Sequence, residues 1–195
     1  TPNSFEESQF QNSNYAADYT RIGPKIYGNT LANNSINGLF LRIRTENGST
    51  LDPLTVSARF ATTDMIYVIE ENLEIQGQPG GLISVNGVLT ARPSARLMID
   101  PGVVIKLGGA RIETEIGAQL IAEGTKAKPI VFTSIFDDRY GASGVFDTTN
   151  NGATAGAAEG DWGGLFFGPM SLGSVDYALI TFGGGSTTIE GGFDK

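Results

Sequence analysis

The stretch GAQLIAEGTKAKPIVFTS, residues 117–134, distinguishes between the folds open to this chain. Two short apolar runs, at 120–122 and 130–132, flank a charged bridge that ends in proline. A helix across the bridge is disfavoured because Gly124 interrupts it and because the residue before Pro129 avoids the helical region. The stretch therefore reads as two short strands joined by a corner.

The same pattern occurs one step earlier, in ARLMIDPGVVIKLGG, which starts at Ala95. At an offset of 23 positions, Leu97 corresponds to Leu120 and Asp100 to Glu123, a glycine follows in each, and a second β run then begins. Segments of about 20 to 25 residues with short strands and tight corners form solenoids, in which neighbouring coils pair at about 4.8 Å. The repeat predicts an all-β fold of stacked parallel coils.

Short apolar runs of strand length continue from residue 38 to residue 182, each bounded by turn residues. Side chains at equivalent places in successive coils should stack in one core. The main candidates for core positions are Leu97, Ile99, Ile105, Leu120, Ile130, Phe132, Leu165, Leu179 and Ile180.

Four Asn-Gly pairs, beginning at positions 37, 47, 86 and 151, support a different fold. Asn-Gly between apolar runs is the strongest short hairpin signal, and a chain of hairpins would give an antiparallel β-sandwich. In a parallel coil, asparagine instead occupies left-handed corner positions, which it tolerates better than most residues. The antiparallel β-sandwich is therefore the alternative fold.

Composition excludes several classes of function. The 13 Lys and Arg residues stand against 21 Asp and Glu, a formal net charge of -8, so a nucleic-acid-binding surface has no electrostatic support. The chain has no cysteine and no histidine, which excludes disulfides, zinc sites built on those ligands and histidine-dependent triads. No run of 18 apolar residues occurs and the chain opens without a basic, apolar leader, so we expect no membrane insertion.

Three stretches carry a family resemblance: NGVLTARPSARLMIDPGVVIKLGG, GAQLIAEGTKAKPIVFTSIFDDRYG and GDWGGLFF. They resemble the right-handed parallel β-helix (pectin-lyase-like) segments of large secreted or cell-surface bacterial proteins. The resemblance covers residues 65–195, while residues 1–64 match more loosely, as N-terminal coils or a cap. It implies a single continuous right-handed solenoid, an extracellular location, and a chain that is part of a longer protein.

The longest irregular stretch, residues 135–161, reads as a loop inserted between two strands. It is rich in carboxylates, and its glycine-rich turns add backbone carbonyls. Ca²⁺ takes six to eight oxygen ligands in flexible geometry, so the loop is a candidate calcium site, with solvated loop acids as the alternative. The candidate ligands are Asp137, Asp138, Asp147, Glu159 and Asp161.

The segment GDWGG, residues 160–164, combines glycines with the only tryptophan. Its glycines suit corners that need positive φ or close backbone approach, and the ring of Trp162 would cover the edge of a coil. The other interpretation is a carbohydrate contact made by Trp162 and Tyr140. Phe166 and Phe167 are adjacent on a strand, so we expect at most one of them to face solvent.

A polysaccharide lyase or hydrolase is the competing class of function. The segment DDR, residues 137–139, superficially resembles the acid pairs of such enzymes, but neighbouring residues on a strand point to opposite faces. The Gly-His-Gly segment of polygalacturonases is also missing. We therefore expect a non-catalytic structural or adhesive module, with polysaccharide binding or degradation as the alternative.

The C-terminal stretch YALITFGGGSTTIEGGFDK reads as a strong strand followed by the start of another coil. The strands of a last coil expose unpaired backbone edges unless something covers them. We therefore expect this end to pair with adjoining coils of the same protein or with a second copy of the chain.

Overall fold

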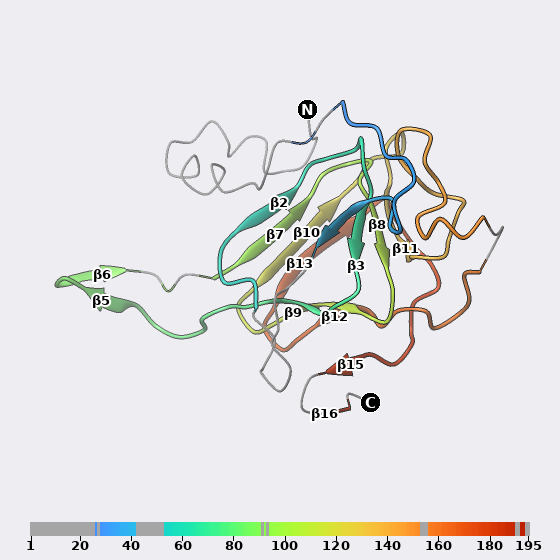
Figure 1. Ribbon diagram of the computed structural model, residues 1–195. Coiled ribbons are helices and arrows are strands. Elements are labelled where there is room, and N and C mark those ends of the chain that lie inside the picture. The colour runs from blue at the N-terminus through green and yellow to red at the C-terminus, as the bar shows by residue number, and fades with distance from the viewer. Residues whose placement is uncertain are drawn as a thin grey trace.

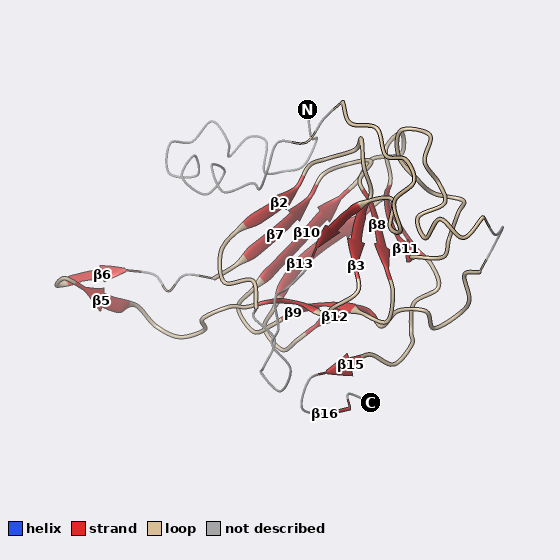
Figure 2. Cartoon of the chain, viewed as in Figure 1, coloured by secondary structure: helices blue, strands red, loops and turns tan. Residues whose placement is uncertain are grey.

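A computed structural model describes residues 26, 28–41, 53–90, 92, 94–152, 156–189 and 192–193. Throughout these residues the secondary structure consists of strands and turns without helices, as Figure 2 shows. The described part of the chain accordingly holds no helix able to span a membrane. The predictions for residues 1–25 and 42–52 lie outside the described residues, as does the Asn-Gly pair at position 47.

Twelve of the strands form three sheets in which every neighbouring pair is parallel. The five-stranded sheet has the order β1 (Leu39–Leu41), β3 (Tyr67–Ile69), β8 (Val104–Leu107), β11 (Ile130–Ser134) and β14 (Ala178–Ile180). The four-stranded sheet has the order β13 (Leu172–Asp176), β10 (Gln119–Glu123), β7 (Arg96–Ile99) and β2 (Ala58–Phe60). The three-stranded sheet has the order β12 (Gly164–Phe167), β9 (Arg111–Thr114) and β4 (Leu73–Ile75).

The chain visits the three sheets in rotation. One round of the chain consists of a strand in the four-stranded sheet, then one in the five-stranded sheet and then one in the three-stranded sheet. The first such round is β2, β3 and β4, and β7, β10 and β13 each begin a new round in the same order. The predicted offset is confirmed, because Leu97 on β7 pairs with Leu120 on β10. The fold is all-β with parallel sheets, and its strand order is compatible with a parallel solenoid (Figure 1).

Antiparallel pairing between named strands is confined to two hairpins in the described residues. One joins β5 (Ile83–Val85) to β6 (Val88–Thr90), and the other joins β15 (Thr188–Ile189) to β16 (Gly192–Phe193). Asn86 and Gly87 have φ values of 51° and 81°, the left-handed geometry that a two-residue hairpin turn requires. The Asn-Gly signal is therefore correct at position 86, whereas the pairs at 37 and 151 join no antiparallel strands and the antiparallel β-sandwich is not observed.

Apolar side chains from all three sheets meet in one core. Leu97 and Leu120 stack in register, as do Ile105 and Phe132 on the five-stranded sheet, and all four are fully buried. Each such burial stabilises the fold by about 1.5–3 kcal/mol. Six predicted core residues are confirmed as buried: Leu97, Ile99, Ile105, Leu120, Ile130 and Phe132.

The other three predicted core residues lie on β12 and β14, each the last strand of its sheet in the described chain. Leu165 and Leu179 are half-buried, and the prediction for Ile180 is wrong because it is 49% exposed. Ile180 pairs in register with the buried Phe132, so its strand position was correct. It is exposed because β14 is the last strand of its sheet in the described chain.

The inserted loop and an N-terminal segment contribute to a second, smaller cluster. Ile66, Val68 and Ile135 are buried together, and Ile36 and Ala142 pack against them. Because Val68 lies between the core residues Tyr67 and Ile69 on β3, it points to the opposite face of the five-stranded sheet. The outer face of this sheet is therefore covered, at least in part, by segments outside the rounds.

Candidate functional site

The polar residues of the repeated motifs meet on the outer face of the five-stranded sheet. Lys106 on β8 pairs in register with Thr133 on β11, and both side chains are fully buried. Lys106 points outward because its neighbours Ile105 and Leu107 belong to the core. The inserted loop folds back over this position and surrounds the lysine with oxygen atoms.

The Lys106 ammonium ties the loop to the sheet. Its Nζ donates hydrogen bonds to the carbonyl oxygen of Phe146 at 2.9 Å and to Oγ1 of Thr148 at 2.7 Å. The backbone N–H of Asn37 donates to the carbonyl oxygen of Thr148 at 2.7 Å, so a third segment joins the same point. Burial lowers the pKa of Lys106 to about 8, although nearby carboxylates, Asp138 foremost, act in the opposite direction.

The two adjacent aspartates of the loop have different environments. Burial alone would raise the pKa of Asp137, but hydrogen bonds from Arg139 at 2.8 Å and from Thr133 at 2.5 Å outweigh it, so that this pKa is lowered. Burial raises the pKa of Asp138, and repulsion from Asp147 adds to the effect. Asp137 is thus a fixed anion paired with Arg139, whereas ionisation of Asp138 is disfavoured.

Of the five predicted calcium ligands, Asp137, Asp138 and Asp147 lie near Lys106 and act on its pKa, whereas Glu159 and Asp161 have other surroundings. Asp147 accepts hydrogen bonds from the backbone N–H groups of Asn151 and Gly152, and Asp161 accepts from Ser134 Oγ at 2.5 Å. Glu159 is exposed. Within the described residues, no three His, Cys, Asp or Glu side chains are placed to hold a metal ion. Calcium binding here stays a prediction, which melting curves with calcium and with a chelator would test.

Neither of the two predicted carbohydrate contacts lines the open groove on the three-stranded sheet. Trp162 is fully buried in the core, and its Nε1 donates a 2.7 Å hydrogen bond to the carbonyl oxygen of Thr181. Its ring therefore presents no face to solvent. Tyr140 is half-buried and lies beside the guanidinium of Arg139, 5.6 Å from the ring centroid.

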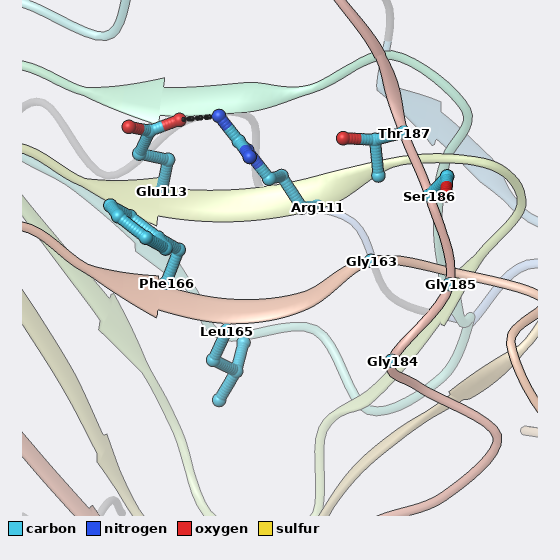
Figure 3. A pocket seen from close by; sticks show the side chains of 9 residues that line it. All are labelled: Arg111, Glu113, Gly163, Leu165, Phe166, Gly184, Gly185, Ser186 and Thr187. Carbon is cyan, nitrogen blue, oxygen red and sulfur yellow. Dashed lines mark hydrogen bonds and ion pairs between the residues drawn. The ribbon is translucent and has the colours of Figure 1, made fainter. Parts of the chain in front are cut away.

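An open groove with a volume of about 480 Å³ lies on the outer face of the three-stranded sheet (Figure 3). Arg111 and Glu113 reach it from β9, and they form an ion pair of 2.6 Å. Phe166 on β12 points to the same side as Glu113, whereas Leu165 points the opposite way. The Arg111 guanidinium lies 5.3 Å from the centroid of the Phe166 ring, which is 46% exposed. The lining residues are Arg111, Glu113, Gly163, Leu165, Phe166, Gly184, Gly185, Ser186 and Thr187.

Carboxylates crowd one flank of this groove. Glu74 on β4 pairs in register with Glu113 on β9. Burial raises the pKa of Glu74, and Glu115 and Glu113 raise it further by repulsion. Burial and the charge of Glu113 also raise the pKa of Glu115. An aromatic face beside an Arg–Glu pair and backbone-rich walls suits a neutral, hydroxyl-rich ligand better than an anionic one.

Sequence reasoning missed the Arg111–Glu113 pair, although a signal was present. The residues Arg111, Ile112 and Glu113 alternate polar, apolar, polar, so the two charged residues share one face of a strand. The expectation that at most one of Phe166 and Phe167 faces solvent is wrong, because they are 46% and 42% exposed. Phe166 faces outward, and Phe167 lies on the last strand of its sheet in the described chain.

Comparisons with protein-family models, with curated proteins and with solved structures find no match to this chain. The fold and the two sites therefore define its class on their own: an all-β protein whose parallel strands are arranged in stacked sheets.

Proposed function

We propose that this chain is a right-handed parallel β-helix that serves as a non-catalytic structural or adhesive module of a secreted or cell-surface bacterial protein. One observation carries the structural role. The last strand of each parallel sheet, β12, β13 or β14, has a free edge in the described chain. Unpaired strand edges are templates for pairing with another chain. Such edges suit a module that stacks on adjoining coils or on a second copy.

Two further considerations support the β-helix. Connections between parallel strands of one sheet are right-handed in about 98% of known cases, and the rotation of the chain through three sheets provides several such connections. The motif resemblance points to the same class of fold and to the extracellular location.

Apolar side chains concentrate at the end of the stack formed by β12, β13 and β14. Ile180 and Phe167 continue the inward-facing columns of Phe132 and Thr114, so they stand where a further coil would cover them. An apolar surface of this kind on a soluble module marks an interaction site. The exposed apolar residues at this end are Phe167, Met170, Leu172, Tyr177 and Ile180.

Sedimentation velocity over a series of protein and salt concentrations tests this role. We expect the chain to form species that grow with concentration, and more so as added salt screens the net charge of -8. Ile180→Lys should abolish growth beyond a dimer, because it places a charge in the stacking surface. The matched control is Ile116→Lys, since Ile116 is 37% exposed but lies at a corner between β9 and β10. Equal association of both variants would refute stacking through this end.

Polysaccharide binding is the second candidate, and the groove beside Phe166 favours it. Affinity electrophoresis in gels containing neutral plant or bacterial polysaccharides would measure it. We expect Phe166→Ala to remove any retardation, while Phe136→Ala, also an exposed phenylalanine, leaves it unchanged. Retardation that is the same in both variants would exclude the groove as the binding site.

A further inference from the structure

The hairpin β5–β6 is an arm that projects from the body of the protein (Figure 1). Ala58 on β2 pairs with Leu97, 39 positions later, whereas Leu97 pairs with Leu120 only 23 positions later. The longer round contains the hairpin, and the shorter one closes without it. The hairpin is therefore an addition that the parallel sheets do not need.

The base of this arm is fixed, while its strands stand free. Arg92 donates from Nε to the carbonyl oxygen of Gly81 at 3.1 Å, and the backbone N–H of Gln78 donates to Ser94 Oγ at 3.3 Å. Beyond that base, β5 and β6 form a two-stranded sheet of their own. An isolated two-stranded hairpin is marginally stable in water, so an arm of this kind gains from pairing.

The surface of the arm is apolar and uncharged. Leu82, Val85, Val88 and Leu89 are between 47% and 68% exposed, a dense group of large apolar side chains on a short segment. Residues 82–90, LISVNGVLT, contain no charged side chain, although the whole chain has a net charge of -8. Strand edges exposed to solvent are usually protected by charges or proline, and neither occurs between residues 82 and 90.

We propose that the β5–β6 hairpin is a dimerisation arm that pairs with the same hairpin of a second copy of this chain. The β6 strands meet antiparallel about a two-fold axis near Leu89 and form a four-stranded sheet in the order β5, β6, β6, β5. In this pairing the free backbone groups of β6 form hydrogen bonds with the second β6 strand. Both faces of the two-stranded sheet become larger, the one that carries Val85 and Val88 and the opposite one that carries Leu89.

Charge favours a second copy as the occupant. The neutral arm is complementary to itself, and its projection keeps two acidic bodies apart when the arms meet. A two-fold interface uses the same patch on both partners and closes at the dimer. Pairing through the arm thus differs from end-to-end stacking, which continues without a limit.

The experiment uses the Ile180→Lys chain, in which stacking is blocked, and measures mass by sedimentation equilibrium. We expect a monomer–dimer equilibrium that does not proceed beyond the dimer. Adding V88E and L89E should give monomers at every concentration, because like charges would face each other across the two-fold axis. The control pair I116E and F136E adds the same charge on the body and should leave the dimer intact. V88E and L89E should leave the melting temperature unchanged at concentrations where the chain is monomeric, since the arm makes no part of the core.

Two outcomes would contradict the proposal that the β5–β6 hairpin is a dimerisation arm. The Ile180→Lys chain could be strictly monomeric, or its dimer could survive the V88E and L89E substitutions. Growth beyond the dimer in the Ile180→Lys chain would instead refute stacking through β14. In that case the V88E and L89E substitutions would still test the arm, because they should reduce association if the arms pair. Because the chain has no cysteine, Ser84→Cys with a spin label gives a second readout. The two labelled β5 strands should lie about 14 Å apart, three strand spacings, in the dimer.

Discussion

Lys106 is a buried cation held by residues that lie far away in the sequence. Its two hydrogen-bond acceptors, Phe146 and Thr148, come from the inserted loop, and three loop aspartates add their electrostatic effect. The loop thus receives a positive charge from the sheet itself. This ammonium occupies the kind of oxygen-rich environment for which the sequence predicted calcium.

The burial of Lys106 predicts how stability depends on pH. Its pKa is about 8 in the folded chain and 10.5 in water, so between these values the unfolded chain binds more protons. Stability should therefore rise with pH in this window, by on the order of 3 kcal/mol in total. Urea unfolding from pH 7.5 to 10.5 would show a smaller rise for Lys106→Met than for the parent chain.

Two further points make this comparison specific. Burial raises the pKa of Tyr67, which lowers stability at high pH, but this effect is common to both chains and cancels in their difference. Lys126→Met is the matched control because Lys126 is exposed. If the parent chain, Lys106→Met and Lys126→Met all share one pH profile, the lysine is not buried as described.

Leu120 tests the core at the level of one side chain. It is fully buried and in register with Leu97 below and Gly173 above. Leu120→Ala should cost about 2–5 kcal/mol of unfolding free energy, measured by chemical denaturation. Leu172→Ala, at a position 58% exposed on the next strand of the same sheet, should change it by less than about 0.5 kcal/mol. A cost below half a kcal/mol for Leu120→Ala would mean that the register is wrong.

The segment GDWGG shows how an element can depend on glycine. Gly160 and Gly164 have φ values of 85° and 109°, which confirms the predicted positive φ. Gly163 is required for another reason: a Cβ there would lie 2.4 Å from Cγ2 of Thr187 and 2.9 Å from Cβ of Arg111. The segment after β14 therefore crosses β12 closely and forms one wall of the groove.

Gly163→Ala should destabilise this crossing by about 1–3 kcal/mol, since the added methyl group has no space. Hydrogen exchange should report faster exchange at Gly185, whose backbone N–H donates to the carbonyl oxygen of Trp162 at 2.9 Å. Gly81→Ala is the control, because a Cβ at Gly81 would meet no atom within 4 Å. Unchanged exchange at Gly185 in Gly163→Ala would contradict the close crossing.

The sequence predicted those features that repeat from round to round. Leu97 and Leu120 are visible as a pair because a buried face imposes the same residue type at the same place in each round. Ile180 follows the same rule, yet its burial depends on whether another strand covers it. The hydrogen bond between Lys106 and Thr148 could not be predicted from the repeat. The two residues are 42 positions apart, and their contact depends on the path of an irregular loop.

At the scale of the whole molecule, a regular stack carries irregular additions on its sides. Figure 1 shows the β5–β6 arm on one side of the stack and the inserted loop on the other. The parallel ladders keep their register across both additions, as the pairing of Ala58 with Leu97 and of Leu120 with Gly173 shows. The stack is thus a scaffold, and the additions supply the surfaces that distinguish one round from the next.

The stack itself is tested most directly by a disulfide placed across one step of the repeat. Arg96 and Gln119 are register partners on β7 and β10, and Arg96 Nε donates to Gln119 Oε1 at 2.8 Å. Neighbouring strands are about 4.8 Å apart, within the range that a disulfide spans. Because the chain has no cysteine of its own, a pair introduced at these two positions can bond only with each other within one molecule.

We predict that R96C combined with Q119C oxidises quantitatively to an intramolecular disulfide in the native state, detected by intact mass and by the loss of free thiols. R96C combined with E123C should not, because Glu123 lies at the far end of β10. Failure of the first pair to bond in the native state, or equal bonding of the second pair, would contradict the parallel stack on which the proposed function rests.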